Sequence, residues 1–172
     1  MSTTESRGRR LRRWALEGAL VVAVWFGVNA WTERDLVGGG PAPPFELRDL
    51  DGNVVSLQAL RGKTVALHFW ATWCGVCRQE LGTLNATHDG LRRDEALYAV
   101  VADSEDPQAV RRFVAEHGIR YPVLLGTEET LRAYRVSAFP TNYFIGADGS
   151  IRDATRGMTT RWALASRIGC SR

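Results

Sequence analysis

The sequence predicts an α/β domain that follows an apolar N-terminal segment, and three observations carry this prediction. Short apolar runs of strand length alternate with segments of helical periodicity from about residue 45 onward. Asp-Gly pairs at 51–52 and 148–149 each separate two strand-like runs and predict β-hairpins. The third observation is a pair of cysteines, Cys74 and Cys77, placed between an apolar strand and a helix.

The N-terminal quarter of the chain divides into three parts by composition. Residues 1–13 hold five arginines against one glutamate and form a basic tail, which we expect on the cytoplasmic side of a membrane. Residues 14–31 are apolar, begin and end with tryptophan, and would span about 27 Å as a helix. They predict a single-pass transmembrane signal-anchor. Residues 32–44 are rich in glycine and proline and predict a linker, so the globular domain is expected over 45–172.

A cleaved signal peptide is the alternative to the anchor, because Val28-Asn29-Ala30 vaguely resembles a cleavage site. The tryptophan that follows and the long apolar run favour the anchor, and the arginine cluster argues against a buried core helix. Both leading alternatives place the domain outside the cytoplasm. Residues 32–172 carry no net charge, so nothing in the domain favours nucleic-acid binding.

The first half of the domain predicts a hairpin, a buried strand, a helix and a second buried strand. Apolar alternation supports the hairpin strands, and continuous apolar runs support the buried strands. The helix shows apolar positions at near-helical spacing and ends at a glycine. In chain order these elements are expected at 45–50 and 53–57, 64–70, from Cys74 to about Gly90, and at 96–102.

The second half predicts two further helices before the second hairpin and one after it. Asp106-Pro107 opens a helix, since proline is favoured in a first turn, and Gly118 closes it. The remaining elements are a strand over 121–125, a short helix over 128–134, hairpin strands over 141–145 and 150–154, and a final helix over about 159–168.

Cys74 and Cys77 have the C-x-x-C spacing of thiol–disulfide exchange. If Cys74 begins a helix, Cys77 lies one turn on, within disulfide reach, and the free N–H groups of the first turn stabilise a thiolate at Cys74. A structural disulfide or half of a zinc site are the alternatives. A zinc site needs further ligands, and the remaining cysteine, Cys170, stands alone and is expected to be a free thiol.

The segment F-W-A-T-W-C-G-V-C-R-Q-E (69–80), together with Phe139-Pro140-Thr141, resembles the active site of the thioredoxin superfamily. The resemblance is to its TlpA/ResA/DsbE-like, ScsD-type branch of membrane-anchored protein disulfide oxidoreductases. It implies a thioredoxin-like fold with a mixed central sheet flanked by helices, an N-terminal β-hairpin and a TlpA-type helical insertion. It also implies no cofactor other than a redox-active disulfide, and no metal.

The resemblance assigns four catalytic positions. Cys74 would be the attacking nucleophile and Cys77 the resolving cysteine. Pro140 would follow a cis peptide bond in a loop that faces the cysteines. Glu80 would move protons to or from Cys77, unless it is a solvated helix residue paired with Arg78.

Three further residues are expected to bind substrate. Trp73 is either a substrate contact beside the thiols or a plain core aromatic. Phe139 would present its backbone to a substrate peptide, with Thr141 beside it. The chain departs from the family pattern at Val76, often proline, and at His68, where thioredoxins carry an aspartate. His68 either titrates near neutral pH or simply packs.

These features predict an extracytoplasmic thiol–disulfide oxidoreductase, acting as a reductant in cytochrome c maturation, disulfide handling or copper tolerance. Its partners would be protein thiols and disulfides and a membrane electron donor of the DsbD/CcdA kind. The alternative is a Cu(I)-binding protein of the metallochaperone type. Such proteins use a C-x-x-x-C spacing, whereas this chain has C-x-x-C. A peroxiredoxin would need threonine or serine three residues before its cysteine, where this chain has Ala71.

Overall fold

The computed structural model describes residues 12, 14–24, 27–28 and 36–171. The chain divides into two compact units, Met1–Asp35 and Leu36–Arg172. The described residues of the first unit are helical. Within the described ranges, no helix is long and apolar enough to cross a membrane. Most of the predicted basic tail and part of the predicted anchor lie outside the described residues.

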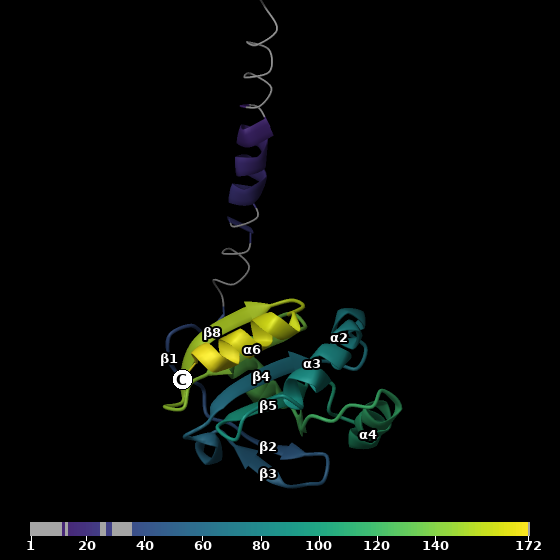
Figure 1. Cartoon of the computed structure of the whole chain (residues 1–172). Coiled ribbons are helices and arrows are strands. Elements are labelled where there is room, and N and C mark those ends of the chain that lie inside the picture. Colours follow the sequence, from purple (N-terminus) through teal and green to yellow (C-terminus); the bar gives the residue numbers. More distant parts are fainter. Residues whose placement is uncertain (1–11, 13, 25–26, 29–35, 172) are drawn as a thin grey trace, which may run out of the picture. The chain divides into compact units, whose positions relative to one another are not determined.

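The second unit is built on one mixed sheet of eight strands, in the order β1-β8-β7-β4-β5-β6-β2-β3 (Figure 1). The central strands β4, β5 and β6 run parallel, and every other neighbouring pair is antiparallel. The strands are β1 (Gly40–Pro41), β2 (Glu46–Asp49), β3 (Val54–Ser56), β4 (Thr64–Trp70), β5 (Glu95–Val101), β6 (Val123–Leu125), β7 (Thr141–Ile145) and β8 (Ser150–Arg156). The mixed sheet and both predicted hairpins are confirmed.

Apolar side chains fill both faces of this sheet. Because successive side chains of a strand alternate, Ala66 and Trp70 of β4 join one core cluster while Leu67 and Phe69 join the other. The first cluster contains both disulfide cysteines and side chains from α3, α4 and α6, and the second receives η1 and the end of α5. The helices are η1 (Gln58–Leu60), α2 (Gly75–Gln79), α3 (Leu81–His88), α4 (Pro107–Glu116), α5 (Glu128–Ala133) and α6 (Arg161–Cys170).

Side-chain caps explain where α4, α5 and α6 begin. Asp106 accepts hydrogen bonds from the first-turn N–H groups of α4, whose first residue is Pro107, as predicted. Thr127 and Thr160 cap α5 and α6 in the same way. The strand β6 and the helix α5 lie between α4 and β7, where a helical insertion was predicted.

The single helix predicted from Cys74 to about Gly90 is wrong, because α2 and α3 are separate helices that meet at Glu80. The Glu80 backbone leaves helical geometry, with φ −101° and ψ 1°. Its side chain enters the buried side of the sheet. Apolar spacing continues through the break, so periodicity alone could not reveal it.

The predicted linker is also wrong from Leu36 onward. Leu36 and Ala42 are buried in the second core cluster, and β1 pairs with β8. The Ala42 N–H donates to the Gly149 carbonyl at 2.9 Å. The glycine and proline content of this segment suggested a loop. Instead, Gly40 and Pro41 pair with β8, and the buried side chains of Leu36 and Ala42 attach the segment to the domain.

Candidate active site

The two cysteines lie where the chain passes from β4 into α2. Cys74 caps the N-terminus of α2, and its Sγ accepts a 3.2 Å hydrogen bond from the backbone N–H of Cys77. The two residues form a disulfide, with their Cα atoms 5.3 Å apart. Cys74 is 7% exposed, whereas Cys77 is fully buried. This is the arrangement that an attacking Cys74 and a resolving Cys77 require.

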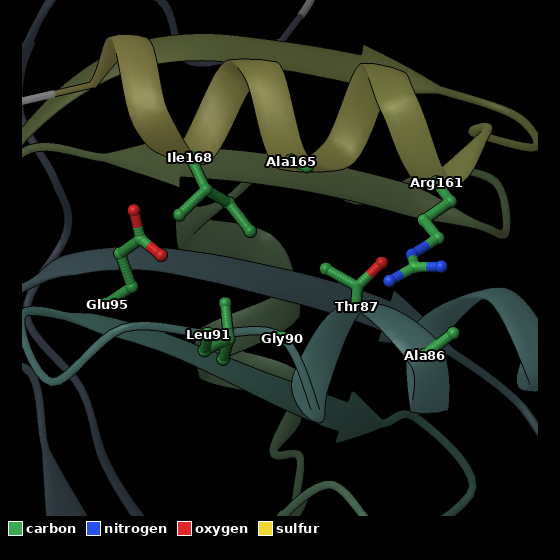
Figure 2. A pocket seen from close by; sticks show the side chains of 8 residues that line it. All are labelled: Ala86, Thr87, Gly90, Leu91, Glu95, Arg161, Ala165 and Ile168. Atoms are coloured by element: carbon green, nitrogen blue, oxygen red, sulfur yellow. The ribbon is translucent and has the colours of Figure 1, made fainter.

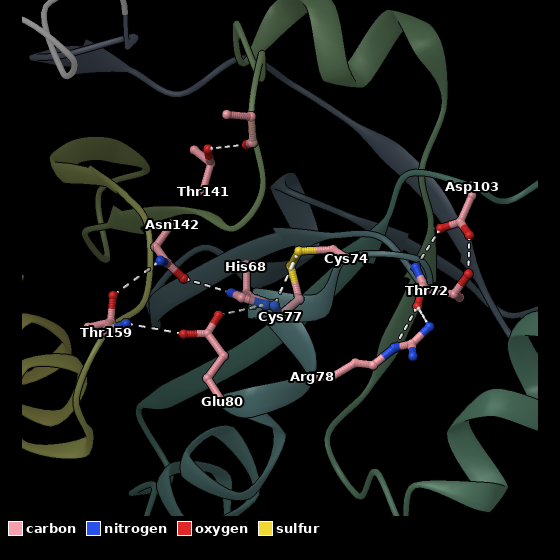
Figure 3. The surroundings of a disulfide bond; sticks show 11 residues. His68, Thr72, Cys74, Cys77, Arg78, Glu80, Asp103, Thr141, Asn142 and Thr159 are labelled. Carbon is pink, nitrogen blue, oxygen red and sulfur yellow. Dashed lines mark hydrogen bonds and ion pairs between the residues drawn. A yellow bond between two sulfur atoms is a disulfide. The ribbon is translucent and has the colours of Figure 1, made fainter.

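The turn before Cys74 is held by contacts that the sequence analysis did not predict. The Thr72 N–H donates to Asp103 Oδ1 at 2.9 Å, and the Thr72 hydroxyl donates to Asp103 Oδ2. Arg78 donates from Nε and Nη2 to the Thr72 carbonyl at 3.1 and 2.8 Å (Figure 3). Asp103 follows β5, which runs parallel to β4, so the two strand ends meet at this turn. These side chains fix the backbone that carries Cys74.

The segment Phe139-Pro140-Thr141 lies against the same turn. The Phe139–Pro140 peptide bond is cis, as the resemblance implied. The Thr141 hydroxyl donates to the Ala138 carbonyl at 2.8 Å, and Thr141 begins β7. The Phe139 ring meets the Trp73 ring edge-on, with ring centres 5.7 Å apart. The structure therefore brings together the three residues predicted to bind substrate and the cis-proline.

Glu80 is turned into the protein and not into solvent. It is 2% exposed, and Oε2 accepts a 3.1 Å hydrogen bond from the Thr159 N–H. Its other oxygen, Oε1, lies 3.5 Å from Nε2 of His68. Burial raises the pKa of Glu80 to about 7, and the Thr159 hydrogen bond opposes this shift. The alternative of a solvated Glu80 paired with Arg78 is thus excluded, since Arg78 binds the turn instead.

His68 belongs to the same buried network. It is 1% exposed and lies on the face of β4 that carries Ala66 and Trp70, which is the face that α2 and α3 cover. Nδ1 of His68 is 2.8 Å from Oδ1 of Asn142, and Nδ2 of Asn142 donates to the Thr159 hydroxyl at 3.3 Å (Figure 3). Burial lowers the pKa of His68 to about 4, against the Asn142 contact, so the ring is neutral at pH 7.

Comparison with known proteins agrees with this geometry. A family model described as the AhpC/TSA family matches residues 39–154. The chain belongs to this thioredoxin-like family. It is 33% identical over 147 residues to the thiol-disulfide oxidoreductase ResA of Bacillus subtilis, covering 85% of this chain and 79% of that one. It is 30% identical over 157 residues to ResA of Geobacillus kaustophilus, covering 89% and 90%.

The solved structures lead to the same group. A thiol:disulfide interchange protein of the thioredoxin family from Chlorobium tepidum superposes with a TM-score of 0.70 at 25% identity. The match covers 78% of this chain and 97% of that one. This member of the thioredoxin-like family is therefore a thiol-disulfide oxidoreductase.

Four residues of the oxidoreductase site were missed from the sequence. They are Thr72, Asp103, Asn142 and Thr159. Asp103 and Asn142 meet the predicted residues through neighbouring strands, and Thr159 meets Glu80 from the segment after β8. One signal was available, because Asp103 is a polar residue directly after a buried strand that neighbours the cysteine strand. Asn142 sits opposite His68 in the pairing of β7 with β4, which local sequence cannot show.

Cys170 and the cavity described below lie outside the buried network of Glu80 and His68. Cys170 ends α6, is exposed and forms no disulfide. In the part of the chain that the structure describes, no group of three or more His, Cys, Asp or Glu side chains could hold a metal ion. A cavity of about 90 Å³ lies between α3, β5 and α6 (Figure 2), and the predicted site residues do not line it. Its lining residues are Ala86, Thr87, Gly90, Leu91, Glu95, Arg161, Ala165 and Ile168.

Proposed function

We propose that this oxidoreductase reduces disulfides of exported proteins through Cys74 and Cys77, with Glu80 as the proton acceptor for Cys77. One observation carries the proposal: a buried carboxyl group follows the fully buried Cys77 by three residues, while Cys74 keeps 7% of its surface exposed. A carboxyl group whose pKa lies near 7 can both take and return a proton at physiological pH.

The reaction begins at Cys74, the more accessible of the two disulfide cysteines. The Cys74 thiolate attacks one sulfur of a substrate disulfide, the substrate S–S bond breaks, and the second substrate sulfur leaves as a thiolate. Cys74 is then joined to the substrate in a mixed disulfide. The N–H groups at the start of α2, including that of Cys77, favour the thiolate that starts this step.

The second step uses the buried cysteine. The Cys77 thiol gives its proton to the Glu80 carboxylate, and its sulfur attacks Sγ of Cys74. The mixed disulfide breaks and the remaining substrate sulfur leaves as a thiolate. The substrate disulfide has gained two electrons, the cysteine pair has lost two, and the Cys77 proton resides on Glu80.

Substrate would bind over the apolar surface beside Cys74. Trp73 and Val76 are 66% and 46% exposed, and Phe139 packs against Trp73 at the start of the cis-proline segment. Large exposed apolar side chains around a reactive cysteine suit an unfolded or extended polypeptide, whose apolar side chains they cover. We propose Thr141, at the start of β7, as part of the same surface.

We further propose that the domain is tethered outside the cytoplasm by residues 14–31, with the arginine-rich residues 1–13 remaining in the cytoplasm. The support is compositional. An exported reductant needs an electron source, and we propose a membrane thiol-transfer protein of the DsbD/CcdA kind. Disulfides of apocytochrome c, of misoxidised exported proteins, or of proteins under copper stress are the proposed substrate classes.

The test is the redox potential of the full chain with Cys170→Ser, equilibrated with glutathione or dithiothreitol buffers. A reductant requires a value near that of thioredoxin, about −270 mV. A value near −120 mV, typical of a strong oxidant, would reverse the proposed direction of electron flow. The absence of a reversible two-electron couple would contradict the proposed use of the cysteine pair.

A further inference from the structure

The side chains of four buried residues form a chain of polar contacts in which the donor and acceptor of each contact can be assigned. They are Thr159, Asn142, His68 and Glu80. The Thr159 hydroxyl accepts from Nδ2 of Asn142, which turns Oδ1 of the same amide toward His68. A carbonyl oxygen only accepts hydrogen bonds, so Nδ1 of His68 must be the nitrogen that bears hydrogen. The other ring nitrogen, Nε2, then carries a lone pair, and it is this atom that lies 3.5 Å from Oε1 of Glu80.

A lone pair of His68 directed at Oε1 favours the protonated form of Glu80. Oε1 is buried and has no hydrogen-bond partner within the described structure. An ionised carboxylate facing the lone pair of Nε2 would lack a donor there, whereas a protonated carboxyl can direct its O–H at Nε2. Oε2 already has its donor in the Thr159 N–H, so the proton belongs on Oε1.

We propose that Asn142 holds His68 in the Nδ1–H tautomer, and that His68 in this state keeps on Glu80 the proton that Cys77 released. His68 and Asn142 are thus positioning residues that act through Glu80. The use of this proton rests on the proposed function, but the proton's location does not. No electron moves in this step, since the proton passes from Cys77 to Glu80 and returns to Cys77 when the disulfide is reduced again.

The groups that interact with this pair are Asn142 of β7, Thr159 after β8 and Tyr121 before β6, and the carbonyl of Cys77 in α2 accepts from the Glu80 N–H. Burial, and next the charge of Glu80, raise the pKa of Tyr121, so its hydroxyl stays neutral at physiological pH. Of His68, Glu80 and Tyr121, only Glu80 therefore changes charge near pH 7.

The tautomer can be observed directly by ¹⁵N NMR of the oxidised full chain with Cys170→Ser in detergent micelles. The chain has three histidines, and loss of one signal set in His68→Gln assigns His68. At pH 6 we expect a neutral His68 with hydrogen on Nδ1, and a ¹³C carboxyl signal of Glu80 that titrates near pH 7. Hydrogen on Nε2, or an imidazolium beside an ionised Glu80, would overturn the proposal.

Asn142→Asp tests whether Asn142 sets the tautomer of His68, because aspartate has nearly the same shape as asparagine. A carboxylate on Nδ1 stabilises the imidazolium, so we expect His68 to become doubly protonated at pH 6. Asn85→Asp is the matched control, because Asn85 is also buried but binds the Gly118 carbonyl and the Arg120 N–H. It should leave the His68 signals unchanged. An unaltered His68 in Asn142→Asp would contradict the proposal, even if the redox potential showed the chain to be a reductant.

Discussion

At the scale of single residues, Glu80 and His68 are buried groups whose pKa values move in opposite directions. Burial raises the pKa of Glu80 from 4.5 to about 7, so over this window the folded chain binds a proton that the unfolded chain has released. Its contribution to the free energy of unfolding therefore falls as pH rises. The pKa of His68 is lowered from 6.5 to about 4, so its contribution rises with pH between these values. The two effects oppose each other between about pH 4.5 and 6.5.

Replacing Glu80 with glutamine removes one of the two effects. We expect the free energy of unfolding of Glu80→Gln to rise by about 2.5 kcal/mol relative to that of the parent chain as pH increases from 5 to 8. Urea unfolding of the oxidised chain at a series of pH values measures this difference. Glu116→Gln, on the exposed side of α4, is the control for the loss of one carboxyl group at the surface. A constant difference between Glu80→Gln and the parent chain would show that Glu80 is ionised throughout.

At the scale of elements, the turn between β4 and α2 depends on the end of β5. Asp103 accepts two hydrogen bonds from Thr72, and the Thr72 carbonyl accepts two from Arg78. We expect Asp103→Ala to destabilise the domain by about 1–3 kcal/mol, because two partly buried donors of Thr72 lose their acceptor. We also expect slower formation of the mixed disulfide at Cys74, since the backbone that carries it is loosened. Rapid-quench measurement of that step checks the second effect.

Asp106→Ala provides the matched comparison for this turn. Asp106 also accepts two backbone hydrogen bonds, but at the N-terminus of α4. Its loss should cost about 1 kcal/mol of stability without slowing the step at Cys74. Equal slowing in both variants would mean that general destabilisation, and not the turn, governs the reactivity of Cys74.

The elements also show how far local sequence could predict this domain. β4 was predicted residue for residue, and α4 was predicted to within its last turn, because a continuous apolar run and a capped amphipathic segment are local signals. The break at Glu80 and the partners Asn142 and Thr159 were not predicted. They depend on which residues face each other across β4 and β7, a relation set by the register of the sheet. The cysteines and cis-proline were found through resemblance, because their spacing is the motif itself.

At the scale of the whole molecule, the proposed membrane anchor is the remaining compositional prediction. We expect the full chain to stay with membranes after alkaline carbonate extraction. The double variant Val22→Arg, Val24→Arg should be released, because each arginine costs about 2.5–3.5 kcal/mol at the centre of a membrane. The double variant Ser2→Arg, Thr3→Arg, in the basic tail, is the control and should stay with the membranes. A mature chain shortened by about 30 residues in mass spectrometry would identify a cleaved signal peptide instead.

The short strand β1 has a consequence for self-association. A sheet margin with free N–H and C=O groups is a template on which another copy can add, and β8 would present one if it were bare. β1 pairs with Ser150 and Ile151 at the start of β8, and Pro41 within β1 has no N–H to offer to an added strand. The start of β8 is thus protected from pairing with another copy, in a domain that also exposes Trp73 beside Cys74. The other end of β8 lies beside the cis-proline segment, where we propose that extended polypeptides dock.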